Sequence, residues 1–344
     1  MTNTAVTGRT DKAVRSGDKI LPSLGIFLVA GGLFLLGWFA YLWFKPIPGP
    51  YQYQLIAEGS GSKQFAQMDL QEWPQLKLEQ YKVKANDIDK PIAEFIVARQ
   101  DDEPPVLMYW KNSTNEVLYN FDRKLSELSA LAVAIIKHAP QDALILSWWD
   151  TSRQIKLLTG RDTLFTSHLN EPLMVPLPWL EQSEAIRAYE NTFWGSKVDS
   201  KEHEQFKRFS QALAAPAEEG AKQLRELIGS NREAYIIVHV TDLYKVGVMY
   251  PDRIGVAYQN FPMTGNMHGM INQMKVQVKE NNFNTYTLQS ISDNEIRAFF
   301  LSDEASSETL LAKMFPFVEK KAPVELEVLQ LIYQQGGYWV YKIP

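Results

Sequence analysis

An uncharged apolar run constrains this chain more strongly than any other feature of its sequence. It extends from Ile20 to Phe44 without a charged side chain. As a helix that rises ~1.5 Å per residue it would be about 37 Å long, which exceeds the ~30 Å hydrocarbon core of a bilayer. A cleaved signal peptide has a shorter apolar region followed by small residues, whereas this run continues through bulky side chains such as Trp38 and Trp43. We therefore expect a transmembrane anchor over residues 20–44, with an aromatic belt at its outer end.

Basic residues are concentrated before this anchor. Arg9, Lys12, Arg15 and Lys19 precede the run, and Lys45 follows it closely. Because basic residues favour the cytoplasmic side of a membrane, we expect residues 1–19 to form a cytoplasmic tail. The rest of the chain is then expected in the periplasm, outside the inner membrane of a bacterium. The stretch "KPIPGP" after the anchor is typical of a semi-rigid linker.

Composition excludes several classes of function. Hydrophobic residues make up 45% of the 344 residues and charged residues 22%, so the part after the anchor has enough apolar side chains for a large core. The net charge of −5 provides no positive field for a polyanion, and we expect no nucleic-acid partner. The absence of cysteine excludes disulfides, thiolate metal sites and covalently attached haem.

The spacing of apolar residues changes near residue 122. Residues 45–122 contain short strand-like runs between turn-forming residues, namely "YQYQLIA", "EQYKVKA", "AEFIVARQ", "PVLMYW" and "EVLYNF". Residues 123–344 instead alternate between helical spacing, as in "RKLSELSALAVAIIKHA", and strand-like runs such as "ALILSWW", "AYIIVHV", "ELEVLQLIYQ" and "YWVYKI". Alternation of this kind is typical of a helix-covered parallel sheet. We therefore predict a mixed α/β fold, with a β-rich part over residues 45–122 and a helix-covered, mainly parallel sheet over residues 123–344.

Two predicted strand-to-helix junctions share one pattern. An apolar run is followed by Ser147 and Asp150 in one junction, and by Thr241 and Asp242 in the other. An aspartate at such a place can accept a backbone N–H that has no partner within the helix, which stabilises the helix by ~1 kcal/mol. Strand ends of a parallel sheet open at one edge, where ligands bind. The junctions therefore predict a set of binding residues: Trp148, Trp149, Asp150, Arg161, His239, Asp242 and Lys245.

The paired tryptophans of the first junction need a separate explanation. Side chains alternate between the two faces of a strand, so Trp148 and Trp149 cannot both lie in one core layer if the strand continues through them. One ring is then expected to line a surface pocket, unless both are buried between the sheet and its helices.

The segment "LILSWWDTSRQIKLLTGRDTLF" resembles the Trp-Trp-Asp junction of oligosaccharyltransferase catalytic subunits. The matching positions are Ser147, Trp148, Trp149, Asp150, Ile155, Arg161, Thr163 and Leu164. In that family the motif recognises the hydroxyl side chain of an acceptor peptide, so the resemblance implies a peptide or glycan ligand. The Tyr-Gly pair of the family is replaced here by Thr151 and Ser152, and the many-spanning catalytic part has no counterpart in this sequence.

In size and layout the chain is similar to the HaoB family of membrane proteins, which are associated with hydroxylamine oxidation in ammonia- and methane-oxidising bacteria. An N-terminal span, a cysteine-poor external domain and the Trp-Trp-Asp segment support this resemblance. It implies a protein partner, the multihaem hydroxylamine oxidoreductase, and a role in anchoring, maturing or supporting that enzyme during nitrification.

Histidine and methionine residues provide weak signals for a metal or cofactor. The histidines show no zinc-site spacing; they are His138, His168, His203, His239 and His268. Methionines gather around His268, at Met263, Met267, Met270 and Met274. Thioethers can bind copper(I) or haem, but methionine more often fills a core. Since nucleotide-binding and hydrolase fingerprints are also missing, we expect no cofactor and no metal.

Three hypotheses follow for the function. The sequence favours a non-catalytic, membrane-anchored accessory protein that supports a periplasmic redox enzyme. The alternative is a glycan- or peptide-binding domain that uses Trp149 and Asp150. An enzyme is the third hypothesis, and it would require acids and bases gathered from both junctions.

Overall fold

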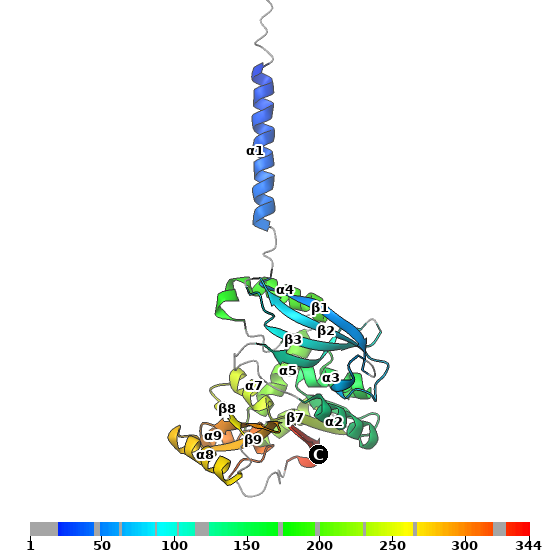
Figure 1. Cartoon of the computed structure of the whole chain (residues 1–344), viewed down its shortest axis with the longest axis vertical. Helices are drawn as coiled ribbons and strands as arrows, with labels where there is room; N and C mark the ends of the chain where they lie inside the picture. The colour runs from blue at the N-terminus through cyan, green and yellow to red at the C-terminus, as the bar shows by residue number, and fades with distance from the viewer. Residues whose placement is uncertain are drawn as a thin grey trace, which may run out of the picture. The chain divides into compact units, whose positions relative to one another are not determined.

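A computed structural model describes the N-terminal helix and most of the domain that follows it (Figure 1). The described residues are 20–44, 49–61, 64–86, 88–101, 103–113, 124–170, 175–196, 200–229, 232–263, 267–318 and 328–344. The chain divides into two compact units, Met1–Pro48 and Gly49–Pro344. The first unit contains helix α1 (Ile20–Phe44). Its Leu24–Phe44 part has a mean hydropathy of 2.0 and is long and apolar enough to cross a membrane.

The second unit begins with an antiparallel sheet in the order β1-β2-β3-β4. Its strands are β1 (Tyr51–Ser60), β2 (Lys77–Ala85), β3 (Ala93–Arg99) and β4 (Val106–Asn112), with the short 3-10 helix η1 (Ala66–Met68) between the first two. These strands confirm the predicted β-rich part, and the further predicted strand "EVLYNF" lies outside the described residues. One face of the sheet packs on the central core through Leu78 and Ile96. The other face buries Phe95 against Trp194.

A five-stranded sheet in the order β11-β12-β7-β5-β6 forms the centre of the domain. Its strands are β5 (Leu144–Ser147), β6 (Asp162–Thr163), β7 (Ala234–His239), β11 (Gln330–Gln335) and β12 (Tyr338–Ile343). Parallel pairing is limited to β7, β5 and β6. Strands β11 and β12 pair antiparallel with each other, because the tight turn between them cannot provide the crossover that parallel strands need. Strand β12 also pairs antiparallel with β7. The mixed α/β class is thus confirmed. Fewer strands of the central sheet pair in parallel than the alternation of elements indicates.

Helices cover both faces of this central sheet. On one face Leu146 and Ile236 pack with α5 (Ser200–Leu213), α6 (Ala217–Ile228), α7 (Asp242–Met249) and α10 (Leu310–Lys313). On the other face Ile145 and Ile237 pack with α2 (Leu125–His138) and α3 (Trp149–Thr159). Burial on two faces explains why the sequences of β5 and β7 are continuous apolar runs.

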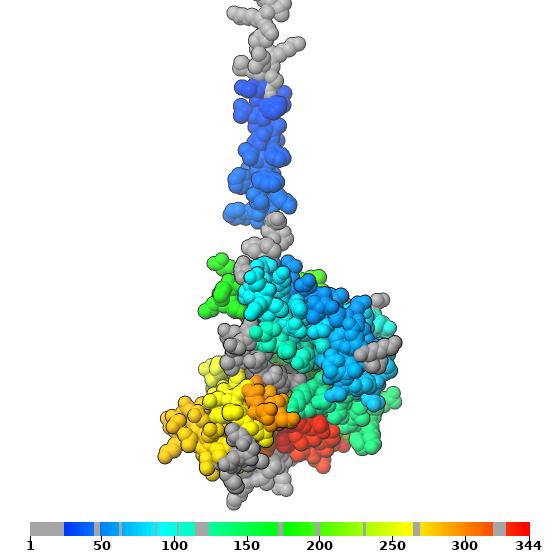
Figure 2. All heavy atoms as spheres, in the orientation of Figure 1, coloured from blue at the N-terminus to red at the C-terminus, as the bar shows by residue number. Residues whose placement is uncertain are grey.

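The remaining elements lie at two ends of the domain. The 3-10 helix η3 (Leu177–Gln182) and α4 (Ser183–Trp194) lie beside the first sheet, as Figure 1 shows. A small antiparallel sheet in the order β8-β10-β9 is formed by β8 (Val256–Pro262), β9 (Thr285–Ser292) and β10 (Glu295–Leu301). It is followed by the short helix α9 (Glu304–Ser307) and packs with α8 (Met267–Glu280) around Met270 and Met274. Figure 2 shows this yellow and orange region at the opposite end of the visible face from the blue and cyan first sheet.

Candidate functional site

The two predicted junctions lie next to each other because β5 and β7 are neighbouring parallel strands. Ser147, the last residue of β5, is paired with Ile237 of β7. Helix α3 therefore begins beside helix α7, at the carboxyl edge of the sheet. This arrangement confirms that both strands end at one edge, where open α/β sheets bind their ligands.

The first strand ends earlier than its sequence predicts. Strand β5 stops at Ser147, Trp148 occupies the N-cap position and Trp149 is the first residue of α3. The Ser152 hydroxyl donates to the Ser147 carbonyl (3.1 Å), and the two hydroxyl oxygens are 2.8 Å apart. These local bonds draw the chain into a helical turn, so the expected strand through "WW" is wrong.

The tryptophans nevertheless face different surroundings. Trp148 is 2% exposed and packs edge-on against Phe206, with a ring-centroid distance of 5.0 Å. Trp149 is partly buried and lies edge-on to His168, 4.4 Å between ring centroids. Trp148 thus belongs to the core, whereas Trp149 packs at its margin against the buried His168.

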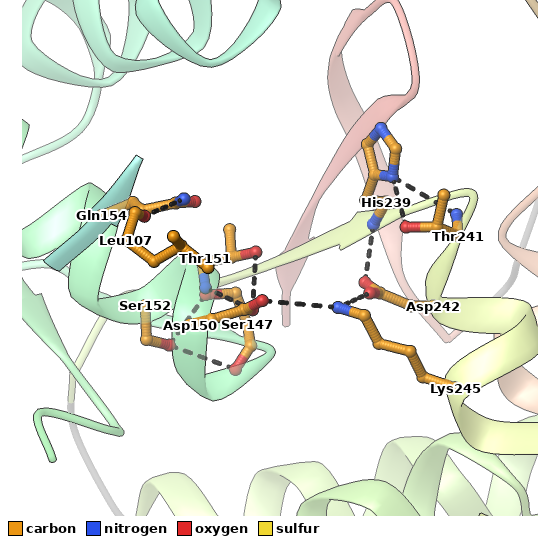
Figure 3. A network of polar contacts seen from close by, with 10 residues as sticks. All are labelled: Leu107, Ser147, Asp150, Thr151, Ser152, Gln154, His239, Thr241, Asp242 and Lys245. Atoms are coloured by element: carbon orange, nitrogen blue, oxygen red, sulfur yellow. Dashed lines mark hydrogen bonds and ion pairs between the residues drawn. The ribbon is translucent and has the colours of Figure 1, made fainter. Parts of the chain in front are cut away.

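A network of charged groups connects the junctions (Figure 3). The Lys245 ammonium lies 2.9 Å from Asp242 Oδ1 and 3.8 Å from Asp150 Oδ2. It also lies 4.8 Å from the centroid of the Trp148 ring, within reach of a cation–π interaction. The Lys245 side chain is 13% exposed and that of Asp242 is 3% exposed. Lys245 therefore links two carboxylates from two helices in one largely buried cluster, in which the Asp150 side chain is 19% exposed.

Neither aspartate occupies the N-cap position of its helix. Asp150 accepts the N–H of Thr151 (2.7 Å) from inside the first turn, where that donor has no partner within the helix. Asp242 accepts the N–H of His239 (2.8 Å), the last residue of β7. Asp150 thus accepts a helix N–H of the predicted kind, although from within the first turn, whereas Asp242 instead fixes the bend between strand and helix.

His239 is held by contacts within the second junction. Its side chain is buried, and Nδ1 lies 2.8 Å from the Thr241 hydroxyl oxygen. The ring lies close to the backbone of Gly337 in the β11–β12 turn. A Cβ at Gly337 would stand 2.3 Å from Nε2 of His239, so the turn requires glycine there.

Arg161 does not join the other predicted site residues. It follows α3, whereas Asp150 lies in the first turn of that helix, and about 13 Å of helix separates Asp150 from the last residue of α3. Its guanidinium donates to the carbonyls of Ile136 and Ala139 at the end of α2. Arg161 therefore satisfies the last carbonyl groups of a neighbouring helix.

Sequence patterns do not indicate that Arg153 and His168 are buried near the junctions. Arg153 is 6% exposed on α3, and burial lowers its pKa to about 10. Burial, together with the charge of Arg153, lowers the pKa of His168 to about 3, so that the imidazole is neutral at physiological pH. The sequence signal that could have indicated Arg153 is a cationic residue on the same helix as the apolar Ile155 and Leu158.

Within the described residues no group of three or more His, Asp or Glu side chains has a geometry that could hold a metal. Met270 and Met274 are buried in the small core next to β10, where they pack with apolar side chains. The side chains of Met267 and His268 lie outside the described part of the structure.

Comparison with known proteins identifies the family. A family described as "HaoA-associated protein HaoB" matches residues 17–343. The chain belongs to this family. The HaoB match includes α1 as well as the whole folded domain, so it covers both compact units. No curated protein matches the chain.

A solved structure is also similar to this HaoB-family chain. It is the crystal structure of the C. jejuni PglB C-terminal domain, with 11% sequence identity and a TM-score of 0.36. The alignment covers 62% of this chain and 98% of that domain. Such a distant likeness carries no argument about the residues of the site.

Proposed function

We propose that this protein is a single-pass membrane protein that supports hydroxylamine oxidation by binding HaoA, the multihaem hydroxylamine oxidoreductase. The observation that supports this proposal best is the family match over residues 17–343. Because that match begins before α1, it includes the apolar helix as well as the folded domain. The accessory role is thus proposed for the helix and the domain together.

The proposed topology places the domain in the periplasm. Arg9, Lys12, Arg15 and Lys19 precede α1, and this bias favours a cytoplasmic N-terminus. The side chains of Leu24–Phe44 are all exposed in the folded chain, as expected for a segment whose natural surroundings are lipid. Protease added to spheroplasts is expected to degrade residues 49–344, and protection of that domain from the added protease would contradict the topology.

The junction cluster supports an organising role for its residues. The Lys245 ammonium partly compensates the charges of Asp150 and Asp242. We therefore propose that they hold α3 and α7 together at the sheet edge, and that Trp149 is the junction residue best placed to contact a partner.

A pull-down from native membranes tests the main proposal. Full-length protein with a C-terminal tag, solubilised in mild detergent, is expected to retain HaoA. The matched control is residues 1–48 with the same tag, which keeps α1 and lacks the folded domain. The proposal would be overturned if the full-length protein recovered no HaoA, or if the control recovered as much HaoA as the full-length protein.

A further inference from the structure

A cavity of about 430 Å³ lies between the β3–β4 connection, helix α3 and the end of α4. Six of its lining residues define its chemistry: Pro104, Val106, Arg153, Lys156, His168 and Trp194. Asp150, Asp242 and Lys245 do not line it, so it is distinct from the junction cluster. Apolar and aromatic side chains form part of its walls, polar and acidic ones such as Asp101 and Glu103 form the rest, and the buried cation Arg153 lies among them.

Arg153 is that cation, and its charge has no close counter-ion in the described part of the chain. It is 6% exposed. Its Nη2 donates to the Pro105 carbonyl at 2.8 Å, and the carboxylates among the described residues that influence its charge do so without a hydrogen bond to it. Asp150, Glu202 and Glu103 act on it from further away. A guanidinium has five N–H donors, and a buried charge without a partner is costly.

Two stacked aromatic rings, with His168 in its neutral form, make up one wall of the cavity. His168 stacks on Trp194 with their ring planes 3° apart and their centroids 4.7 Å apart. The Trp194 indole N–H donates to Glu190 at 2.6 Å. The Glu202 carboxylate accepts the N–H groups of Thr166 and Ser167, which fixes the segment before His168. A ligand entering the cavity would therefore meet a preorganised aromatic surface.

We propose that this cavity binds a carboxylate, with Arg153 as its anchoring cation and the His168–Trp194 stack as the wall for its carbon skeleton. The planar guanidinium fork matches a carboxylate in a bidentate arrangement. Asp101 and Glu103 also line the cavity and are exposed, so their charges disfavour a doubly charged phosphate more than a singly charged carboxylate. The carboxylate belongs either to a free organic acid or to an acidic group of a protein partner.

Benzoate is the probe that fits this chemistry, because it joins a carboxylate to an aromatic ring, and benzamide is its uncharged counterpart. Full-length protein in detergent is titrated with each compound, and binding is followed by tryptophan fluorescence and by the shift in Tm. Saturable binding of benzoate, with binding of benzamide at least about tenfold weaker, is the expected result.

Two variants make the test specific to Arg153. Arg153→Met is expected to fold, since it removes a buried charge that lacks a counter-ion, and to weaken benzoate binding at least about tenfold. Arg153→Lys keeps the charge without the planar fork and is expected to bind benzoate less tightly than the original protein. Arg187→Met, at an exposed position of α4, is the matched control and should bind benzoate normally.

The proposal fails if benzoate does not bind saturably, if benzamide binds equally well, or if Arg153→Met and Arg153→Lys both bind benzoate as tightly as the original protein. These outcomes are independent of HaoA, so they leave the proposed accessory function untouched. Adding benzoate to the HaoA pull-down then separates the two sources of the carboxylate. Release of HaoA assigns the carboxylate to the partner, and retention assigns it to a free organic acid.

Discussion

At the scale of single residues, the Lys245 ammonium between Asp242 and Asp150 matters most for the stability of the sheet edge. Removing one member of a buried ion cluster leaves the other charges without compensation. Lys245→Met should therefore lower the free energy of unfolding by about 3 kcal/mol, measured by urea denaturation with tryptophan fluorescence. Lys342→Met is the control, because the Lys342–Glu233 pair is 40% and 36% exposed and such pairs contribute below about 1 kcal/mol. Equal losses in the two variants would contradict the structural role of Lys245.

His168 predicts a pH dependence of stability. Its pKa falls from 6.5 to about 3 on folding, so between these pH values the unfolded chain binds a proton that the folded chain does not. Its stabilising effect is therefore complete above about pH 6.5 and is lost as the pH falls toward 3. At pH 5 the loss amounts to about 2 kcal/mol. His168→Gln lacks this titration, so the stability lost between pH 7 and pH 5 should be smaller by that amount; identical pH profiles would disprove the assignment.

At the scale of whole elements, Glu190 attaches helix α4 to strand β1. Glu190 is 5% exposed. Its carboxylate accepts hydrogen bonds from the hydroxyls of Tyr51 and Tyr53, the latter at 2.6 Å, and from the Trp194 indole N–H. Burial and the charge of Glu190 raise the pKa of both tyrosines, which keeps them as donors.

Glu190→Gln tests this attachment. The amide offers one acceptor oxygen where the carboxylate offers two, so a buried donor loses its partner at a cost of about 2 kcal/mol. Denaturant unfolding measures the loss. Glu184→Gln, at an exposed position of the same helix, should change stability little, and a comparable effect there would argue against a specific tie between α4 and β1.

The elements differ in how well the sequence predicts them. Strands β5 and β7 are recognisable because both faces are buried and their sequences are almost entirely apolar. Strands β9 and β10 were not predicted. The middle of β10 carries Arg297, which is fully buried and is accommodated by donating to Asn260 on β8 at 2.8 Å. That partner is 37 residues away in the chain, and local spacing gives no sign of it.

The same limit applies to the candidate site. The two junctions were predicted together because parallel strands place their carboxyl ends at one edge, and Asp150, Asp242 and Lys245 do meet there. Arg161 is grouped with them because it matches a position of the Trp-Trp-Asp motif, yet its guanidinium binds the end of α2. Local sequence gives no sign of the role of Arg153, because the carbonyl that accepts its hydrogen bond belongs to Pro105, 48 residues earlier.

At the scale of the whole molecule, the anchor and the domain are separable units. Residues 49–344 contain their own cores around β5, β7 and β10, and none of these cores includes a residue of α1. The described side chains of α1 are exposed. The folding free energy of the domain should therefore not depend on the anchor.

Removing residues 1–48 should convert the protein into a soluble form that needs no detergent. The Tm of this shortened chain should match that of the full-length protein, because no core contact is lost, and it should still retain HaoA in a pull-down from solution. Binding of HaoA to vesicles is expected to require the full-length chain, since α1 provides the apolar area that enters the bilayer. Aggregation or a lower Tm of the shortened chain would show that α1 contributes to the fold, and its persistence in the membrane fraction would reveal a second membrane contact on the domain itself.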